Sequence, residues 1–175
     1  YTALGTFPLT PAGIRVAGGV TKNLDKIEEK YLVTPFNAKA MVLFPERING
    51  KIVAMLTVHT DSPPAKIAIA EFEKEEDIWS LGYWDNWYKD LDSHWIDPRR
   101  AVTDHVEIGA PPIKTEYGWL LVYSHIQDYY TNNKVFGIEA LLLDLKNPKE
   151  IVGRTKGAIL VPEEIYEKYG HIGNI

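Results

Sequence analysis

Residues 111–123 read Pro-Pro-Ile-Lys-Thr-Glu-Tyr-Gly-Trp-Leu-Leu-Val-Tyr, and this stretch decides the class of fold. A short apolar lead, a turn centred on residues 116–118 and an apolar, aromatic run from Trp119 to Tyr123 predict a β-hairpin. Lys114 precedes the predicted turn, and His125 follows the predicted strand. Because β-scaffolds often carry their sites where strands end, these two basic side chains are candidate site residues.

Short strand-like runs separated by turn signals continue on both sides of this hairpin. The predicted strands cover residues 14–20, 31–34, 40–44, 52–58, 66–72, 135–145 and 151–155. Asn49-Gly50 predicts a tight hairpin turn, because both turn positions need a positive φ. One helix is predicted at residues 162–169, with Pro162 in its first turn and Gly170 as its cap. Many short strands and almost no helix favour a sandwich, a barrel or a propeller.

A weak internal repeat favours the propeller. The stretch from Phe44-Pro45 to His59 resembles the stretch from Pro111-Pro112 to His125, and the two histidines are 66 residues apart. Propeller repeats take about 40 to 50 residues or more. The 175 residues are therefore expected to form a single partial β-propeller domain of roughly two to three blades. A closed propeller has about 4–8 blades, so further chain, a partner chain or a homo-oligomer would complete the ring.

Composition limits the classes of function. A net charge of −5 argues against a nucleic-acid partner. No apolar run approaches the ~18 residues of a membrane span, and no signal-peptide pattern opens the sequence, which favours the cytoplasm. Cysteine is absent and the five histidines lack ligand spacing, so no metal site is expected. The five tryptophans, four of them between residues 79 and 95, are expected to pack between sheets and not to form a sugar platform.

Five motifs in order resemble glycoside hydrolase family 130. They are Leu43–Lys51 (LFPERINGK), Asp90–Trp95 (DLDSHW), Gly109–Thr115 with Gly118–Leu120, Leu142–Leu145 with Asn147-Pro148, and Pro162–Glu164 with Tyr166, Glu167 and Gly170. The resemblance implies an all-β, five-bladed β-propeller of which this chain is a central fragment. It also implies inverting chemistry on β-mannosides such as manno-oligosaccharides, with inorganic phosphate as co-substrate and no other cofactor.

The resemblance also implies the site. The family's general acid is an Asp in a Glu-Asp-Pro-Arg motif, which does not occur in this sequence, so the acid is expected outside these residues. Of three basic positions for phosphate, the first maps to Lys39, the third to Lys114, and the second, after His59, is Thr60. Arg99 or Arg100 could replace the missing cation. The predicted phosphate- and substrate-binding residues are therefore Lys39, His59, Lys114, Tyr123 and His125.

Two alternatives remain open from the sequence. A hydrolase would need a carboxylate base about 6.5–9.5 Å from the acid in the inverting geometry. Glu139 is the first candidate for that base, and Glu107 and Asp61 are weaker ones; Glu139 could instead pair with an arginine. The second alternative is a noncatalytic carbohydrate-binding β-domain, which the missing acid motif favours.

Overall fold

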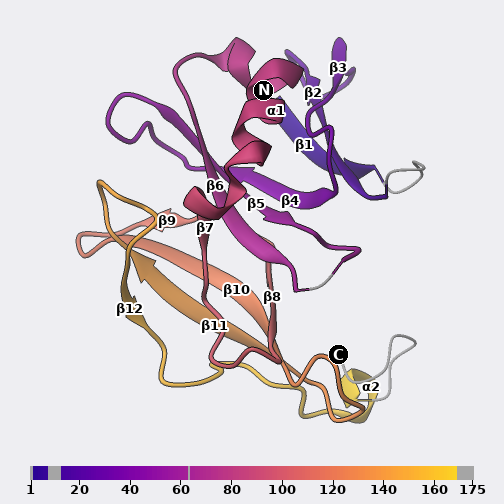
Figure 1. Cartoon of the computed structure of the whole chain (residues 1–175), viewed down its shortest axis with the longest axis vertical. Helices are drawn as coiled ribbons and strands as arrows, with labels where there is room; N and C mark the ends of the chain where they lie inside the picture. The colour runs from indigo at the N-terminus through magenta and orange to yellow at the C-terminus, as the bar shows by residue number, and fades with distance from the viewer. Residues whose placement is uncertain (1, 8–12, 63, 169–175) are drawn as a thin grey trace.

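Three antiparallel sheets make up most of the structure, a computed structural model that describes residues 2–7, 13–62 and 64–168 (Figure 1). The N-terminal sheet has the order β1 (Thr2–Phe7), β2 (Arg15–Val20), β3 (Glu29–Leu32). The middle sheet has the order β4 (Ala38–Leu43), β5 (Ile52–Val58), β6 (Lys66–Phe72), β7 (Trp95–Ile96). The C-terminal sheet has the order β12 (Ile151–Arg154), β11 (Val135–Leu143), β10 (Trp119–Gln127), β8 (His105–Ile108), and β9 (Ile113–Lys114) also pairs with β10. The helices are α1 (Leu81–Lys89), α2 (Ile165–Lys168) and the short 3-10 turns η1 (Glu75–Trp79) and η2 (Leu91–Ser93).

The middle sheet is buried on both faces, because successive side chains of a strand point to opposite sides. In β5, Ala54 and Leu56 belong to a core shared with the N-terminal sheet and α1. Val53 and Met55 belong to a second core shared with the C-terminal sheet. The sheets are therefore stacked in chain order, and the continuous apolar runs of β5 and β6 reflect burial on both sides.

Helix α1 is the longest element that the sequence prediction missed; the short strands β7 and β8 were not predicted either. Ser80 caps its first turn by accepting a hydrogen bond from the Tyr83 amide at 3.2 Å. Trp84 and Trp87, three residues apart on one helical face, are 0% and 5% exposed in the first core. Trp79 stacks on Tyr31 of the N-terminal sheet at 4.4 Å. The tryptophans in this region are thus packing residues, as expected.

The hairpin that opened the sequence argument is confirmed, with one correction. Ile113–Lys114 pairs with Leu120–Trp119, and the turn lies between them. Strand β10 continues to Gln127, whereas the predicted strand ended at Tyr123. His125 therefore lies within the strand and not after it. The extension has a physical cause, since β10 pairs along its whole length with the nine-residue strand β11.

The internal repeat corresponds to equivalent positions in two sheets. Phe44-Pro45 follows edge strand β4 and leads to β5, while Pro111-Pro112 follows edge strand β8 and leads to β10. The all-β expectation holds for these residues. The helix predicted at residues 162–169 is shorter, at Ile165–Lys168, and its predicted end and cap lie outside the described residues. Within the described ranges, no helix is long and apolar enough to cross a membrane.

Replacing Trp84 by Ala should lower the free energy of unfolding by about 3–5 kcal/mol, because the ring is fully buried and its indole N–H bonds to the Ile78 carbonyl. The matched control is Leu81→Ala on the same helix, whose side chain is 52% exposed. Urea unfolding followed by circular dichroism measures both. Equal losses in the two variants would contradict this account of α1.

Candidate functional site

Most of the predicted site residues lie at one end of the middle and C-terminal sheets, which we call the polar end. Lys39 lies opposite Thr57 in the β4–β5 register, and the His59 amide bonds to the Asn37 carbonyl at 3.1 Å. In the C-terminal sheet, His125 of β10 lies opposite Val106 of β8. The ends of the two sheets meet, because Lys39 forms an ion pair across to β8.

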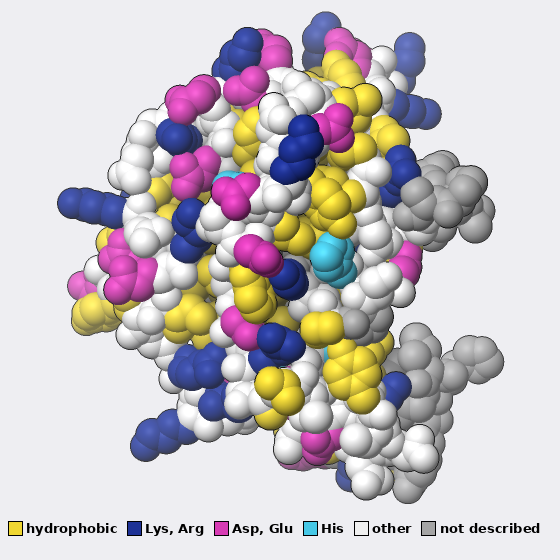
Figure 2. Space-filling view, viewed as in Figure 1, with side chains coloured by type: hydrophobic (Ala, Val, Ile, Leu, Met, Phe, Trp, Pro, Cys, Tyr) yellow, Lys and Arg dark blue, Asp and Glu magenta, His cyan; other side chains and the backbone are white. Residues whose placement is uncertain are grey.

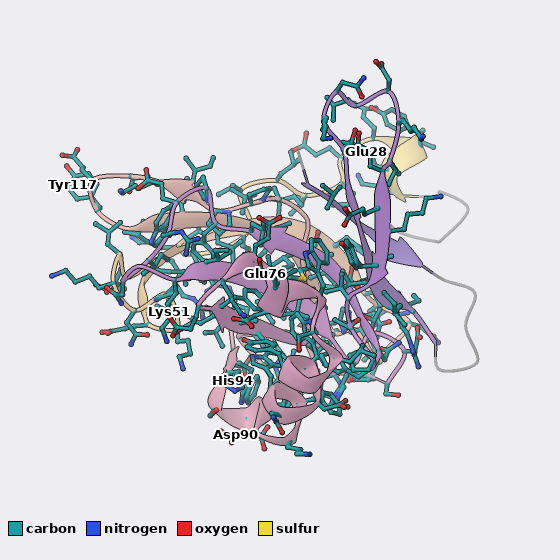
Figure 3. All side chains as sticks on the ribbon, turned by 90° about the horizontal axis from the view of Figure 1, so that it is seen from above. Glu28, Lys51, Glu76, Asp90, His94 and Tyr117 are labelled. Carbon is teal, nitrogen blue, oxygen red and sulfur yellow. The ribbon has the colours of Figure 1, made fainter. Side chains whose placement is uncertain are left out.

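Lys114 lies at the opposite end of the C-terminal sheet. It pairs with Trp119 at the start of β10, and Trp119 and His125 are separated by six residues, or roughly 20 Å of strand. Its ammonium group is half exposed and contacts Glu46 at 2.5 Å. Tyr117, at the tip of the same turn, protrudes at the edge of the molecule (Figure 3). The structure thus does not bring Lys114 together with Lys39, His59, Tyr123 and His125.

Glu107 joins the two sheets at the polar end. Its Oε1 accepts a hydrogen bond from Lys39 Nζ at 2.7 Å and one from His105 Nε2 at 3.0 Å. The hydrogen bond from His105, together with the charge of Lys39, lowers the pKa of Glu107 to about 2 from an ordinary value of 4.5. His105 is buried against Tyr129, with ring centroids 4.2 Å apart. Glu107 is therefore an ionised carboxylate that fixes the position of the Lys39 ammonium group.

Glu139 is the centre of a second charged cluster on β11. Its carboxylate, 2% exposed, receives hydrogen bonds from Arg100 Nε at 2.9 Å and Arg100 Nη2 at 2.8 Å. The Tyr123 hydroxyl donates to the same carboxylate at 2.9 Å. Burial alone would raise the pKa of Glu139, but the hydrogen bonds from Arg100 and Tyr123 outweigh it and lower the pKa. The alternative that Glu139 pairs with an arginine is confirmed.

Asp104 and His125 extend this cluster into the loop before β8. Asp104 Oδ2 accepts hydrogen bonds from the Ala101 amide at 2.8 Å and from the Arg100 amide at 3.1 Å, and it contacts His125 Nε2 at 3.0 Å. The other ring nitrogen of His125, Nδ1, lies 3.5 Å from Glu139 Oε1. Burial would raise the pKa of Asp104, yet the amide and histidine hydrogen bonds lower it. The imidazole of His125 thus lies between two ionised carboxylates.

A cavity of about 270 Å³ opens beside this second cluster. Its lining includes Arg100, Asp104, His125, Glu139 and Lys156. Fixed donors and acceptors around a small cavity suit a polar ligand whose hydroxyl or anionic oxygens can replace water. Among the described residues, no group of three His, Cys, Asp or Glu side chains could hold a metal ion.

The remaining candidates have other surroundings. His59, at φ 61° just after β5, bonds through Nε2 to the Tyr88 hydroxyl at 2.9 Å, and burial lowers its pKa. The hydroxyl of Thr60 is buried without a hydrogen-bond partner in the described part of the chain. Asp61 accepts hydrogen bonds from the Ile14 amide and from Asn37, and so ties the N-terminal sheet to the middle sheet. Arg99 pairs with its neighbour Asp97.

Sequence reasoning missed Asp104 and His105 entirely. The signal for them was weak, because an Asp-His pair in a loop before a short strand has many structural explanations. The sequence named Arg100 only together with Arg99, as alternative cations. In the structure Arg99 pairs with Asp97 and Arg100 with Glu139, and the second pairing joins residues distant in sequence. On the face drawn in Figure 2, acidic and basic side chains are interspersed, so surface charge alone does not mark the site either.

The low pKa of Glu107 makes stability depend on pH. Between pH 4.5 and about 2 the unfolded chain binds the proton and the folded protein does not. Stability should therefore rise with pH across this window and fall as pH drops through it. In Glu107→Gln the free energy of unfolding should rise less with pH across this window, as measured by urea unfolding at several pH values. Glu46→Gln, which removes a negative charge at the other end, is the control, and an equal rise in wild type and Glu107→Gln would contradict the assignment.

Comparison with known proteins identifies the family. A family model described as glycoside hydrolase family 130, β-1,4-mannooligosaccharide phosphorylase, matches residues 12–175. A 1,2-β-oligomannan phosphorylase of Thermoanaerobacter sp. (strain X514) is 36% identical over 167 residues, which cover 92% of this chain and 48% of the relative. A β-1,2-mannobiose phosphorylase of Listeria innocua is 32% identical over 167 residues, which cover 93% of this chain and 42% of the relative. The chain spans about half the length of the curated relatives that it matches.

The fold agrees with these matches. The solved structure of β-1,2-mannobiose phosphorylase from Listeria innocua, in complex with β-1,2-mannobiose, superposes with a TM-score of 0.74 at 30% identity. The match covers 99% of this chain and 46% of that chain. The family model alone matches nearly the whole sequence. The chain therefore belongs to glycoside hydrolase family 130.

Proposed function

We propose that the protein carrying this chain cleaves β-mannosides by inverting phosphorolysis. An oxygen of inorganic phosphate attacks the anomeric carbon, and the bond to the glycosidic oxygen breaks on the opposite face. A carboxylic acid outside these residues protonates the leaving oxygen. A β-mannoside and phosphate thus yield α-mannose 1-phosphate and a sugar shortened by one unit. Inversion follows from the single displacement.

One observation carries this proposal: at the polar end Glu107 holds the Lys39 ammonium group in a fixed position, in a chain whose relatives are named as phosphorylases. Phosphate in a crowded site needs fixed cationic donors. Glu107 positions the Lys39 ammonium group for this role. His59, Tyr123 and His125 supply further polar groups.

The proposed architecture is a five-bladed β-propeller in which the three sheets are successive blades. Their stacking in chain order and the edge positions of β4 and β8 support this. In a propeller the first strand of each blade lies nearest the central axis, so Lys39 and Glu107 would face that axis. The site would then lie where the polar ends of several blades meet.

Hydrolysis remains the second candidate, and the state of Glu139 disfavours it. A general base needs a pKa near the working pH and a free oxygen beside the attacking water. The pKa of Glu139 is lowered, and Arg100 and Tyr123 occupy both its oxygens. Glu107 is likewise engaged by Lys39. That Glu139 acts as a base stays a prediction for the hydrolase alternative only.

The reaction can be decided by incubating the protein that carries this chain with β-1,2- and β-1,4-mannobiose, with and without inorganic phosphate. We expect mannose 1-phosphate only when phosphate is present, as measured by ion chromatography. Free mannose without phosphate would identify a hydrolase. Sugar binding without turnover in either condition would reject both enzyme proposals and favour a noncatalytic carbohydrate-binding domain.

Two lysine variants test where phosphate binds. Lys39→Met should raise the KM for phosphate by about tenfold or more, because it removes a fixed cation from the site. Lys114→Met, at the far end of the C-terminal sheet, should raise it much less. Initial rates at varied phosphate and saturating mannobiose measure both. A larger effect of Lys114→Met would support its sequence-based assignment and contradict the placement of phosphate at the polar end.

A further inference from the structure

A short segment bulges from the edge of the C-terminal sheet, and we call residues 155–158 the strap. After β12 the chain still bonds to β11, first by the Thr155 amide to the Ala140 carbonyl at 3.0 Å. The Ile159 amide then bonds to the Ile138 carbonyl at 2.8 Å. Between these two hydrogen bonds the chain advances by four residues, from 155 to 159, while β11 advances by only two, from 140 to 138. The two extra residues loop out, as in a β-bulge.

The bulge creates the space of the candidate site. Lys156, Gly157 and Ala158 of the strap line the 270 Å³ cavity together with the buried side chains of His125 and Glu139. The return of the strap depends on a glycine of β11. A Cβ at position 137 would lie 3.0 Å from the Ala158 Cβ, closer than ordinary packing allows. The strap is thus anchored at both ends and lies over a polar floor.

Arg100 connects the strap to the rest of the site. Its Nη2 donates to the Thr155 carbonyl at 2.6 Å and to Glu139 Oε2 at 2.8 Å. Its own amide bonds to Asp104 in the loop before β8. One guanidinium group therefore joins the strap, β11 and this loop. A bidentate carboxylate partner fixes the plane of an arginine, so Glu139 sets the direction in which Arg100 reaches Thr155.

We propose that the strap is the roof of the sugar site and that Arg100 and Glu139 are positioning residues that hold it. The proposal rests on the proposed function, since the ligand is the sugar ring of a β-mannoside. Under the strap, the Lys156 side chain and the backbone groups of the bulge meet the hydroxyl groups of the sugar. Loss of the Arg100–Glu139 pair leaves the strap anchored only by its β11 hydrogen bonds, so the roof opens.

The first test needs no activity. Lys156 is exposed, but trypsin needs a segment that can detach from its neighbours, so cleavage after Lys156 should be faster when the strap opens. In the full-length protein, Arg100→Lys and Glu139→Gln should each speed this cleavage by about tenfold, as measured by mass spectrometry. Cleavage after the exposed Lys22, in the connection between β2 and β3, is the internal reference. Arg47→Lys, which makes the same substitution in an exposed turn, is the matched control and should change neither rate.

The second test links the strap to the sugar. Arg100→Lys and Glu139→Gln should raise the KM for mannobiose by about tenfold while kcat changes by less than about threefold, because the roof binds the sugar and does no chemistry. Saturating mannobiose should slow trypsin cleavage after Lys156 in the wild-type protein. A merely structural pair would change stability and kcat without this split.

The outcomes separate the two proposals. Unchanged cleavage after Lys156 in both variants would overturn the positioning role of Arg100 and Glu139. Faster cleavage with an unchanged KM and no protection by mannobiose would overturn the strap as the roof of the site. If wild-type protein turns over no mannoside, the proposed function fails, and the cleavage rates alone still decide the positioning role. If Glu139→Gln also speeds cleavage after Lys22, it is misfolded, and Arg100→Lys decides.

Discussion

Burial of the middle sheet on both faces is the constraint on which the rest of the structure depends. Strands β5 and β6 carry apolar side chains toward both sides, so this sheet is stable only between two apolar partners. The N-terminal sheet with α1 covers one face, and the C-terminal sheet covers the other. This stacking packs β8 against β5 and β6 of the middle sheet. Lys39 can then reach Glu107 over 2.7 Å, although the two are far apart in sequence.

The charges at the polar end follow from the same packing. A buried or half-buried charge is costly unless it is paired and hydrogen-bonded. Lys39 is paired with Glu107, and Arg100 with Glu139, so each cation has a fixed direction. The lowered pKa values of Glu107 and Glu139 keep both carboxylates ionised. Such carboxylates hold cations well and accept protons poorly, which suits a site that binds phosphate and sugar better than one that activates water.

Local patterns predicted the parts of the fold that depend on neighbouring residues. The hairpin at residues 111–123 was predictable because its turn and its strands lie in one stretch. Helix α1 was missed because its tryptophans and Gly82 are poor helix formers. The spacing of Trp84 and Trp87 on one face, after the cap Ser80, could have revealed it.

The site was less predictable because its contacts are distant in sequence. Family resemblance named Lys39 and His125, but only the strand lengths show that Lys114 lies at the other end. Arg100 and Glu139 are 39 residues apart, and no local pattern distinguishes Arg100 from Arg99. Their pairing depends on how the loop before β8 packs against β11. The sequence could predict that Glu139 pairs with an arginine, but it could not predict which arginine that is.

The central claim is that phosphate and mannoside bind at the polar end, beside the cavity under the strap. The most direct test is a crystal structure of the protein that carries this chain, soaked with mannobiose and a phosphate analogue. The account predicts a sugar ring between the strap and Glu139, and an anion within hydrogen-bond distance of Lys39. Sugar and anion bound beside Lys114, at the opposite end of the C-terminal sheet, would contradict it.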